Sequence, residues 1–197
     1  MLYINIAYIM AYNMLTNILF GNYMYPIQIA ICVGTTIYNA FLFSSNISDI
    51  PLCSAMTQAL VGVFAARGIW VASEYAVHRW ILHGPLYINY HKNHHEHYTD
   101  KRWLFTPLIM TSMAGYTYYM VLRWTIGGQI TTAIFIFLPL NYLFFEWLHW
   151  RIHSPVRDKN SILWMAQQYH RTHHMYPNKN YGITSPAMDY LTNTLDS

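Results

Sequence analysis

Five apolar stretches, each close to twenty residues long, constrain the fold more than any other feature of this 197-residue chain. They cover approximately residues 2–20, 26–45, 57–77, 105–122 and 129–148. A helix needs about 20 mostly apolar residues to cross the hydrocarbon core of a bilayer. Only 10% of the residues are charged, against about 25% in soluble domains. The sequence therefore predicts an all-α integral membrane protein with four core transmembrane helices, and leaves a fifth at the N-terminus open.

Charge and histidine are confined to the later part of the chain. All eleven Lys and Arg residues lie at or after Arg67, and all eleven histidines lie at or after His78. The stretch 1–66 is therefore expected to be an apolar anchor, and residues 70–195 are expected to carry the chemistry. We predict that residues 1–197 form a single membrane-bound domain.

Two polar, histidine-rich stretches, residues 78–102 and 149–197, are separated by two of the apolar stretches. A helical hairpin with its turn at the Gly127-Gly128 pair would return the chain to the side it left, so that the two polar stretches meet. They hold nine of the eleven Lys and Arg residues, and such residues are enriched on the cytoplasmic side of membranes. The sequence predicts a histidine-rich helical cap that faces the cytoplasm.

The histidines follow the same order in both halves of the chain. EYAVHRWILH precedes HKNHH, and FEWLHWRIH precedes HRTHH. Because each helical residue advances by about 100°, HxxHH places its three imidazoles on one face. His149 and His153, four residues apart, also share a face. His78 and His83, five apart, would diverge by roughly 140° on an α-helix, so they need a helix end or a wide cavity to converge.

This repeat predicts a site for two metal ions. Imidazole binds zinc, copper, iron and nickel, so the ligand type alone does not name the metal. Ten histidines exceed what one zinc ion takes, whereas two ions with four or five imidazoles each leave positions open for oxygen. That count favours a di-iron centre, with zinc as an alternative occupant of the isolated protein. The candidate ligands are His78, His83, His91, His94, His95, His149, His153, His170, His173 and His174.

Two carboxylates accompany the histidines, each about one turn deeper on the same helical face. Glu74 precedes His78 by four residues, and Glu146 precedes His149 by three. Metal-bound imidazoles commonly donate their second N–H to a carboxylate. We therefore expect the two glutamates to hold ligand histidines, with anchoring at the membrane interface as the alternative and direct ligation left open. His97 lies outside every pattern.

At these histidines, residues 70–195 resemble the fatty acid hydroxylase and sterol desaturase superfamily of membrane di-metal enzymes. The resemblance rests on the four histidine motifs and on NYGITSPAMDYLTNT, where Asn193-Thr194 replaces the family's closing Gly-Thr. It implies that all ten candidate histidines are metal ligands. It also implies two irons, molecular oxygen, and a separate electron donor such as a b-type cytochrome with its reductase.

The function that the resemblance implies is hydroxylation of a lipid C–H bond, with a fatty acyl or sphingolipid chain as the expected substrate. A sterol oxidase or desaturase would use the same histidines, and a carotenoid hydroxylase or a membrane metal carrier is a weaker alternative. We expect a location in the endoplasmic reticulum membrane of a eukaryote or the cytoplasmic membrane of a bacterium.

Overall fold

The part of the chain that the structure describes is helical, and no strand occurs within it, which confirms the all-α prediction. The computed structural model describes residues 24–47, 50–84, 89–98, 100 and 103–196. The expected helix over 2–20 lies outside these residues. The elements are α2 (Met24–Ile47), α3 (Leu52–Ala76), η1 (Val77–Leu82), α4 (Asn89–Glu96), α5 (Leu108–Ile126), α6 (Gly128–Ile152), α7 (Ile162–Met175) and α8 (Ala187–Leu191).

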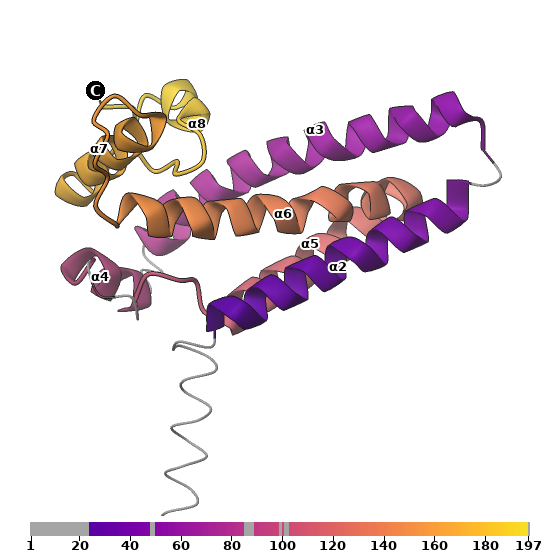
Figure 1. Cartoon of the computed structure of the whole chain (residues 1–197), viewed down its shortest axis with the longest axis horizontal. Helices are drawn as coiled ribbons and strands as arrows, with labels where there is room; N and C mark the ends of the chain where they lie inside the picture. The colour runs from indigo at the N-terminus through magenta and orange to yellow at the C-terminus, as the bar shows by residue number, and fades with distance from the viewer. Residues whose placement is uncertain (1–23, 48–49, 85–88, 99, 101–102, 197) are drawn as a thin grey trace, which may run out of the picture.

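The long helices form an elongated bundle in which α3 and α2 both pack against α6, while α5 lies behind it (Figure 1). Three segments are long and apolar enough to cross a membrane, namely Tyr25–Ile47, Leu52–Leu82 and Gly128–Ile152. They confirm three of the predicted stretches. The predicted stretch 105–122 corresponds to α5, a helix of 19 residues.

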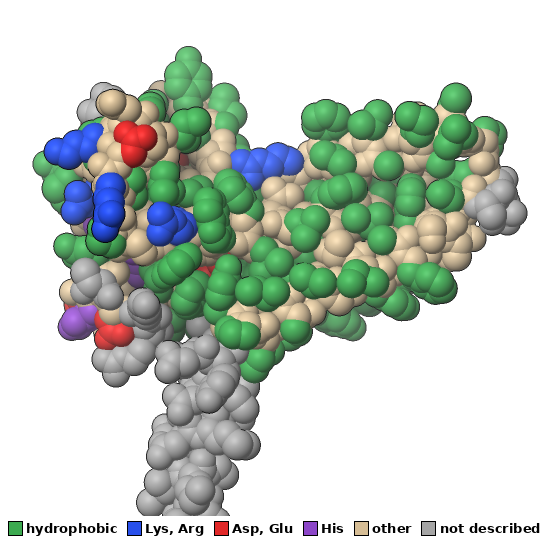
Figure 2. Space-filling view, in the orientation of Figure 1, with side chains coloured by type: hydrophobic (Ala, Val, Ile, Leu, Met, Phe, Trp, Pro, Cys, Tyr) green, Lys and Arg blue, Asp and Glu red, His purple; other side chains and the backbone are tan. Residues whose placement is uncertain are grey.

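Apolar side chains cover the face of this bundle that Figure 2 shows. Ile37, Phe64 and Trp124, for example, are 63%, 73% and 82% exposed. A soluble monomer rarely exposes large continuous apolar surface. The surface is that of an integral membrane protein, because lipid is the solvent in which such side chains are stable.

The predicted hairpin between α5 and α6 is confirmed. α5 ends at Ile126 and α6 begins at Gly128, while Gly127 between them has a φ of 84°. A residue with a Cβ rarely adopts that conformation, whereas glycine does so at little cost. The tight turn sends α6 back along α5, so that α4, α7 and α8 gather at the other end of the bundle (Figure 1).

Close packing joins α3 to α6 in the middle of the bundle. A Cβ added to Gly62 would lie only 2.7 Å from the carbonyl oxygen of Ala133, so glycine allows the two backbones to approach. One turn further along α3, Ala66 is fully buried in a cluster with Ile134 and Phe135. This contact fixes the direction in which α6 and η1, the continuation of α3, carry their histidines out of the bundle.

Arg67 turns inward, as its position in an apolar helix requires. Its guanidinium donates to the Oδ1 atom of Asn141 at 3.3 Å and to the carbonyl oxygen of Thr184 at 2.8 Å. Thr184 belongs to the segment after α7, 117 residues along the chain. The arginine therefore attaches the C-terminal segment to the membrane bundle beside the histidines.

Candidate metal centre

A π-helical turn, η1, carries the first histidine pair. The backbone N–H of His83 donates to the carbonyl oxygen of His78 at 3.1 Å, a contact between residues five apart. Such a turn is wider than an α-helical turn and occurs frequently at functional sites. It stacks residues that an α-helix would separate, and the two imidazole ring centres lie 5.0 Å apart. The π-helical turn therefore brings together two imidazoles that would point apart on an α-helix.

One group of five histidines forms where η1, α4 and α7 meet. Nitrogen atoms from each member all lie within 4.8 Å of one another. Successive Nε2 atoms are 3.1 Å apart for His78 and His91, 3.0 Å for His91 and His83, and 3.1 Å for His83 and His173. The group, called cluster A below, consists of His78, His83, His91, His95 and His173.

A second group lies directly beside cluster A. Ring centres of His95 in cluster A and His174 in the second group are 4.3 Å apart. The Nε2 atom of His153 lies 2.9 Å from that of His170 and 3.2 Å from that of His149. Four members have nitrogen atoms within 4.8 Å of one another, and His149 lies at their edge. The group with this neighbour, called cluster B, consists of His94, His149, His153, His170 and His174.

Each HxxHH motif is divided between the two clusters. α4 contributes His91 and His95 to cluster A and His94 to cluster B, and α7 contributes one histidine to cluster A and two to cluster B. The structure therefore brings together all ten histidines singled out in the sequence. His97, outside the patterns, is exposed and belongs to neither cluster.

Main-chain carbonyl groups hold three of the imidazoles at their Nδ1 atoms. A carbonyl oxygen only accepts, so Nδ1 carries the proton and the lone pair of Nε2 is left for a metal. These partners could not be predicted from the sequence, because any residue supplies a carbonyl group. The pairs are His78 with Tyr181 at 2.5 Å, His149 with Leu104 at 3.2 Å, and His173 with Lys179 at 2.7 Å.

Glu74 differs from its expected role, because its hydrogen bonds in the structure go to the C-terminal segment rather than to His78. Its carboxylate accepts from the backbone N–H of Thr184 at 2.8 Å and from that of Ile183. The indole N–H of Trp70, one turn away on α3, donates to it at 2.8 Å. The N–H groups of this irregular segment have no helical partners, so the buried carboxylate accepts their hydrogen bonds instead of one from a histidine.

Glu146 also hydrogen-bonds elsewhere than the expected histidine. Its Oε1 atom accepts from the backbone N–H of Thr106 at 3.0 Å and from the hydroxyl of Tyr142 at 2.8 Å. The glutamate is fully buried and ties α6 to the segment before α5. That segment includes Leu104, whose carbonyl oxygen accepts from His149, so the carboxylate acts on the histidine through the backbone.

The electrostatics of the clusters suit a metal cation. Burial lowers the pKa of His83, His95 and His153 to about 4, so these imidazoles are neutral near pH 7 and can bind a metal. In the described part of the chain, both nitrogens of His94 and the Nε2 atom of His95 are buried without a hydrogen-bond partner. Buried polar atoms without partners are costly, and metal ions at these positions would satisfy them.

Asp189 organises the segment that supplies two of the carbonyl groups. Its fully buried carboxylate accepts from the backbone N–H of Tyr181 at 2.8 Å and from that of Gly182 at 2.7 Å. The hydroxyls of Thr194 and Tyr169 each donate to it at 2.7 Å. The sequence showed this aspartate only as part of the C-terminal motif and assigned it no role.

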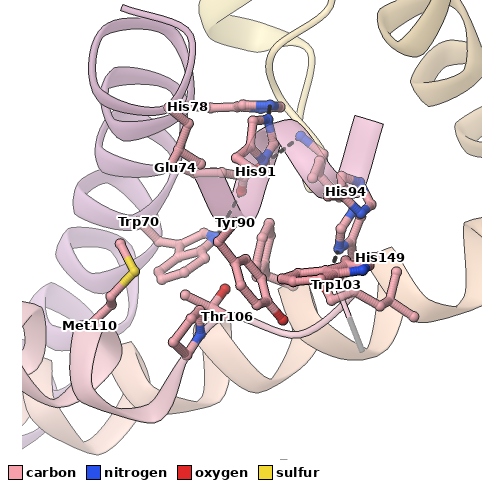
Figure 3. A pocket seen from close by; sticks show the side chains of 15 residues that line it. Trp70, Glu74, His78, Tyr90, His91, His94, Trp103, Thr106, Met110 and His149 are labelled. Carbon is pink, nitrogen blue, oxygen red and sulfur yellow. Dashed lines mark hydrogen bonds between the residues drawn. The ribbon is translucent and has the colours of Figure 1, made fainter. Parts of the chain in front are cut away.

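An apolar pocket of about 110 Å³ opens against both clusters (Figure 3). His78 and His91 of cluster A and His94 and His149 of cluster B line one part of it. Aromatic and aliphatic side chains make the opposite walls, so the pocket can hold an apolar group next to the imidazoles. These walls include Trp70, Leu82, Tyr90, Trp103, Met110 and Phe145.

The model of the fatty acid hydroxylase family matches residues 60–194, which include all ten histidines of the two clusters. The chain belongs to the fatty acid hydroxylase family. The predicted superfamily is thereby confirmed from a match over more than half of the chain. The first 59 residues, which include α2, lie outside this match.

Individual relatives have hydroxylase names. The chain is 26% identical to rat fatty acid 2-hydroxylase over 80% of its own length and 45% of the relative's. It is also 26% identical to the ceramide very long chain fatty acid hydroxylase scs7 of Schizosaccharomyces pombe, over 89% and 54% of the two chains. This chain spans about half the length of these two relatives. A beta-carotene hydroxylase from a Paracoccus species is 29% identical and is covered over 91% of its length.

A solved structure shares the fold. The hydroxylase domain visible in the structure of full-length scs7p superposes with a TM-score of 0.71 at 16% sequence identity. The match covers 88% of this chain and 67% of the other. The arrangement of helices around the clusters is thus the fold of a known hydroxylase domain.

Proposed function

We propose that this protein is a membrane non-haem di-iron monooxygenase that hydroxylates a C–H bond in a fatty acyl or sphingolipid chain. The observation that carries the proposal is the pair of adjoining five-histidine clusters that face an apolar pocket. Imidazole ligands suit iron among other transition metals. Cluster A would hold one ion and cluster B the other.

The protein's own residues prepare the site for this chemistry. The carbonyl groups of Tyr181, Lys179 and Leu104 fix three imidazoles with their Nε2 atoms turned into the clusters. Trp70 and Trp103 help to line the pocket and exclude water from the carbon that reacts. The bound irons would supply the activation of molecular oxygen, which side chains alone do not provide.

The overall reaction requires an external reductant. One oxygen atom is inserted into the C–H bond and the other leaves as water, so each turnover consumes two electrons and two protons. We propose that a separate b-type cytochrome with its reductase supplies the electrons. Lys and Arg side chains gather on the end of the molecule that carries α4 and α7 (Figure 2), which supports a cytoplasmic orientation of this end. The membrane would be the endoplasmic reticulum in a eukaryote or the cytoplasmic membrane in a bacterium.

A comparison of cellular lipids tests the proposal. The chain is expressed in a host with a matching reductase system, beside a His94→Ala, His95→Ala variant and a His97→Ala control. The wild type and the control should each produce a lipid with one additional oxygen, and the double variant should not. A lipid lacking two hydrogens would instead indicate a desaturase. No lipid change in the wild type, with iron and reductant supplied, would overturn the proposal.

Carotenoid hydroxylation is a second candidate, because the Paracoccus beta-carotene hydroxylase is covered over 91% of its length whereas the rat fatty acid 2-hydroxylase is covered over 45%. The same host supplied with beta-carotene separates the two activities. Oxygenated carotene together with unchanged acyl chains would replace the first proposal with this one.

A further inference from the structure

A second and larger cavity lies inside the membrane bundle. It has a volume of about 520 Å³ and is lined mainly by residues of α2, α3, α5 and α6. This volume is within the range of about 300–1,000 Å³ that is typical of ligand pockets. It adjoins the pocket at the histidines, since five residues line both. The shared residues are Trp70, Glu74, Thr106, Met110 and Phe145.

The cavity extends about 15 Å along the bundle. Its lining runs on α2 from Gln28 to Asn39 and on α6 from Phe145 back to Phe135, and each helical residue adds about 1.5 Å. At the far end, the rings of Tyr119 and Phe135 pack edge to face with their centres 5.2 Å apart. This depth is roughly half of the ~30 Å hydrocarbon core, which is about the thickness of the hydrocarbon region in one leaflet.

The cavity also opens sideways out of the bundle. Ile31 and Tyr38 of α2 line it and are 47% and 62% exposed, and Tyr116 of α5 lines it and is 68% exposed. The surroundings of these helices are lipid, so the opening faces acyl chains rather than water. A chain in the same leaflet could enter by lateral movement without changing its depth.

We propose that this cavity receives the hydrocarbon chain of the lipid substrate, which enters from the bilayer while the polar end of the lipid stays beside the histidine clusters. This inference rests on the proposed hydroxylase function and specifies its substrate. The carbon presented to the clusters is then near the polar end of the chain, and the depth of the cavity sets the preferred chain length. Part of the wall is supplied by α2, which lies outside the family match.

Gly115 offers a way to shorten the cavity without disturbing the fold. It lines the cavity on α5, seven residues beyond Leu108, where α5 begins. A Cβ added there would meet no atom within 4 Å. Met113 on the same helix is 66% exposed and does not line the cavity. Gly115→Phe and Met113→Phe therefore form a matched pair, of which only the first fills the cavity.

The test measures binding and product separately. Wild type, G115F and M113F are reconstituted in phosphatidylcholine nanodiscs and irradiated with palmitic acid that carries a terminal diazirine, and the labelled peptides are mapped by mass spectrometry. In parallel, the hydroxylated chains made in cells fed with fatty acids from octanoic to stearic acid are compared. G115F should lower labelling of the cavity wall by about tenfold and shift the products to shorter chains, and M113F should change neither.

Equal labelling of all three proteins would overturn the cavity proposal, as would unchanged product lengths in G115F. If no protein makes an oxygenated lipid but G115F alone loses labelling, the cavity binds a chain and the proposed hydroxylation fails. Thermal unfolding and metal content check that G115F is folded. If G115F is not folded, the smaller Gly115→Leu variant is used instead. It should lose labelling in the same way, and labelling equal to that of the wild type would overturn the cavity proposal.

Discussion

The backbone N–H of Tyr181 donates to the carboxylate of Asp189 at 2.8 Å, while the carbonyl oxygen of the same tyrosine accepts from His78. The buried carboxylate thus fixes the residue whose carbonyl group orients a histidine of cluster A. Asp189 also accepts from Gly182, Thr194 and Tyr169, so it holds the C-terminal segment together at the point where that segment meets the clusters.

Asp189→Asn should therefore weaken both the fold and cluster A. The amide replaces one accepting oxygen with a donor, which leaves backbone donors of the segment without a partner and costs about 1–3 kcal/mol. We expect a lower unfolding temperature in detergent and a lower metal content per chain. Asp196→Asn, at an exposed position nearby, is the control and should leave both values unchanged. Full stability and metal content in D189N would show that the carboxylate does not position His78.

The sequence predicted the features that depend on composition and spacing. Four of the apolar stretches correspond to α2, α3, α5 and α6, and the Gly127-Gly128 pair forms the hairpin turn. All ten candidate histidines lie in the two clusters. Helical periodicity accounts for the shared faces of the HxxHH motifs and of His149 and His153, whereas His78 and His83 meet through the π turn. Asn193, which replaces the glycine of the family's C-terminal motif, has a φ of 57°. Asparagine tolerates this left-handed conformation better than most residues, so the replacement preserves the turn.

Other features depended on tertiary contacts that leave no mark in the sequence. The π turn at His78 and His83 differs from an α-helix only in its hydrogen-bond pattern, which local propensity does not specify. The carbonyl group of Tyr181 reaches His78 from 103 residues away. Glu74 was predicted to hold a histidine from its spacing alone, yet the backbone of the distant C-terminal segment contacts its carboxylate instead.

The division of the histidines into two clusters predicts separable metal losses. His83→Ala removes a member of cluster A, and His153→Ala removes a member of cluster B. Each single variant should lose about half of the bound metal, because the other cluster keeps its ligands, and the double variant should lose nearly all of it. Elemental analysis of the purified proteins measures the ratio. His97→Ala should retain the full content, and a complete loss in both single variants would argue for one shared metal site.

Acid should destabilise the protein after metal removal by a chelator. The pKa of His83, His95 and His153 is about 4 in the fold against an ordinary value of 6.5. Between these values the unfolded chain binds protons that the folded chain does not, so the free energy of unfolding decreases as the pH falls from 6.5 toward 4. Unfolding temperatures measured across this interval should decline. The decline should be smaller when the three histidines are replaced by alanine. An equal decline in that variant would show that protonation of these histidines does not cause the loss of stability.

The contact of α3 with α6 predicts a large effect from a single methyl group. In Gly62→Ala the new Cβ would lie 2.7 Å from the carbonyl oxygen of Ala133, so the two helices must separate, at a cost of about 1–3 kcal/mol. We expect a lower unfolding temperature, together with weaker metal binding, since α6 carries His149 and α3 continues into η1, which carries His78. Gly68→Ala on the same helix is the matched control. Its Cβ meets no atom within 4 Å, and alanine has the higher helix propensity, so this variant should be at least as stable as the wild type. Equal unfolding temperatures for the two variants would show that the close approach at Gly62 does not hold the bundle together.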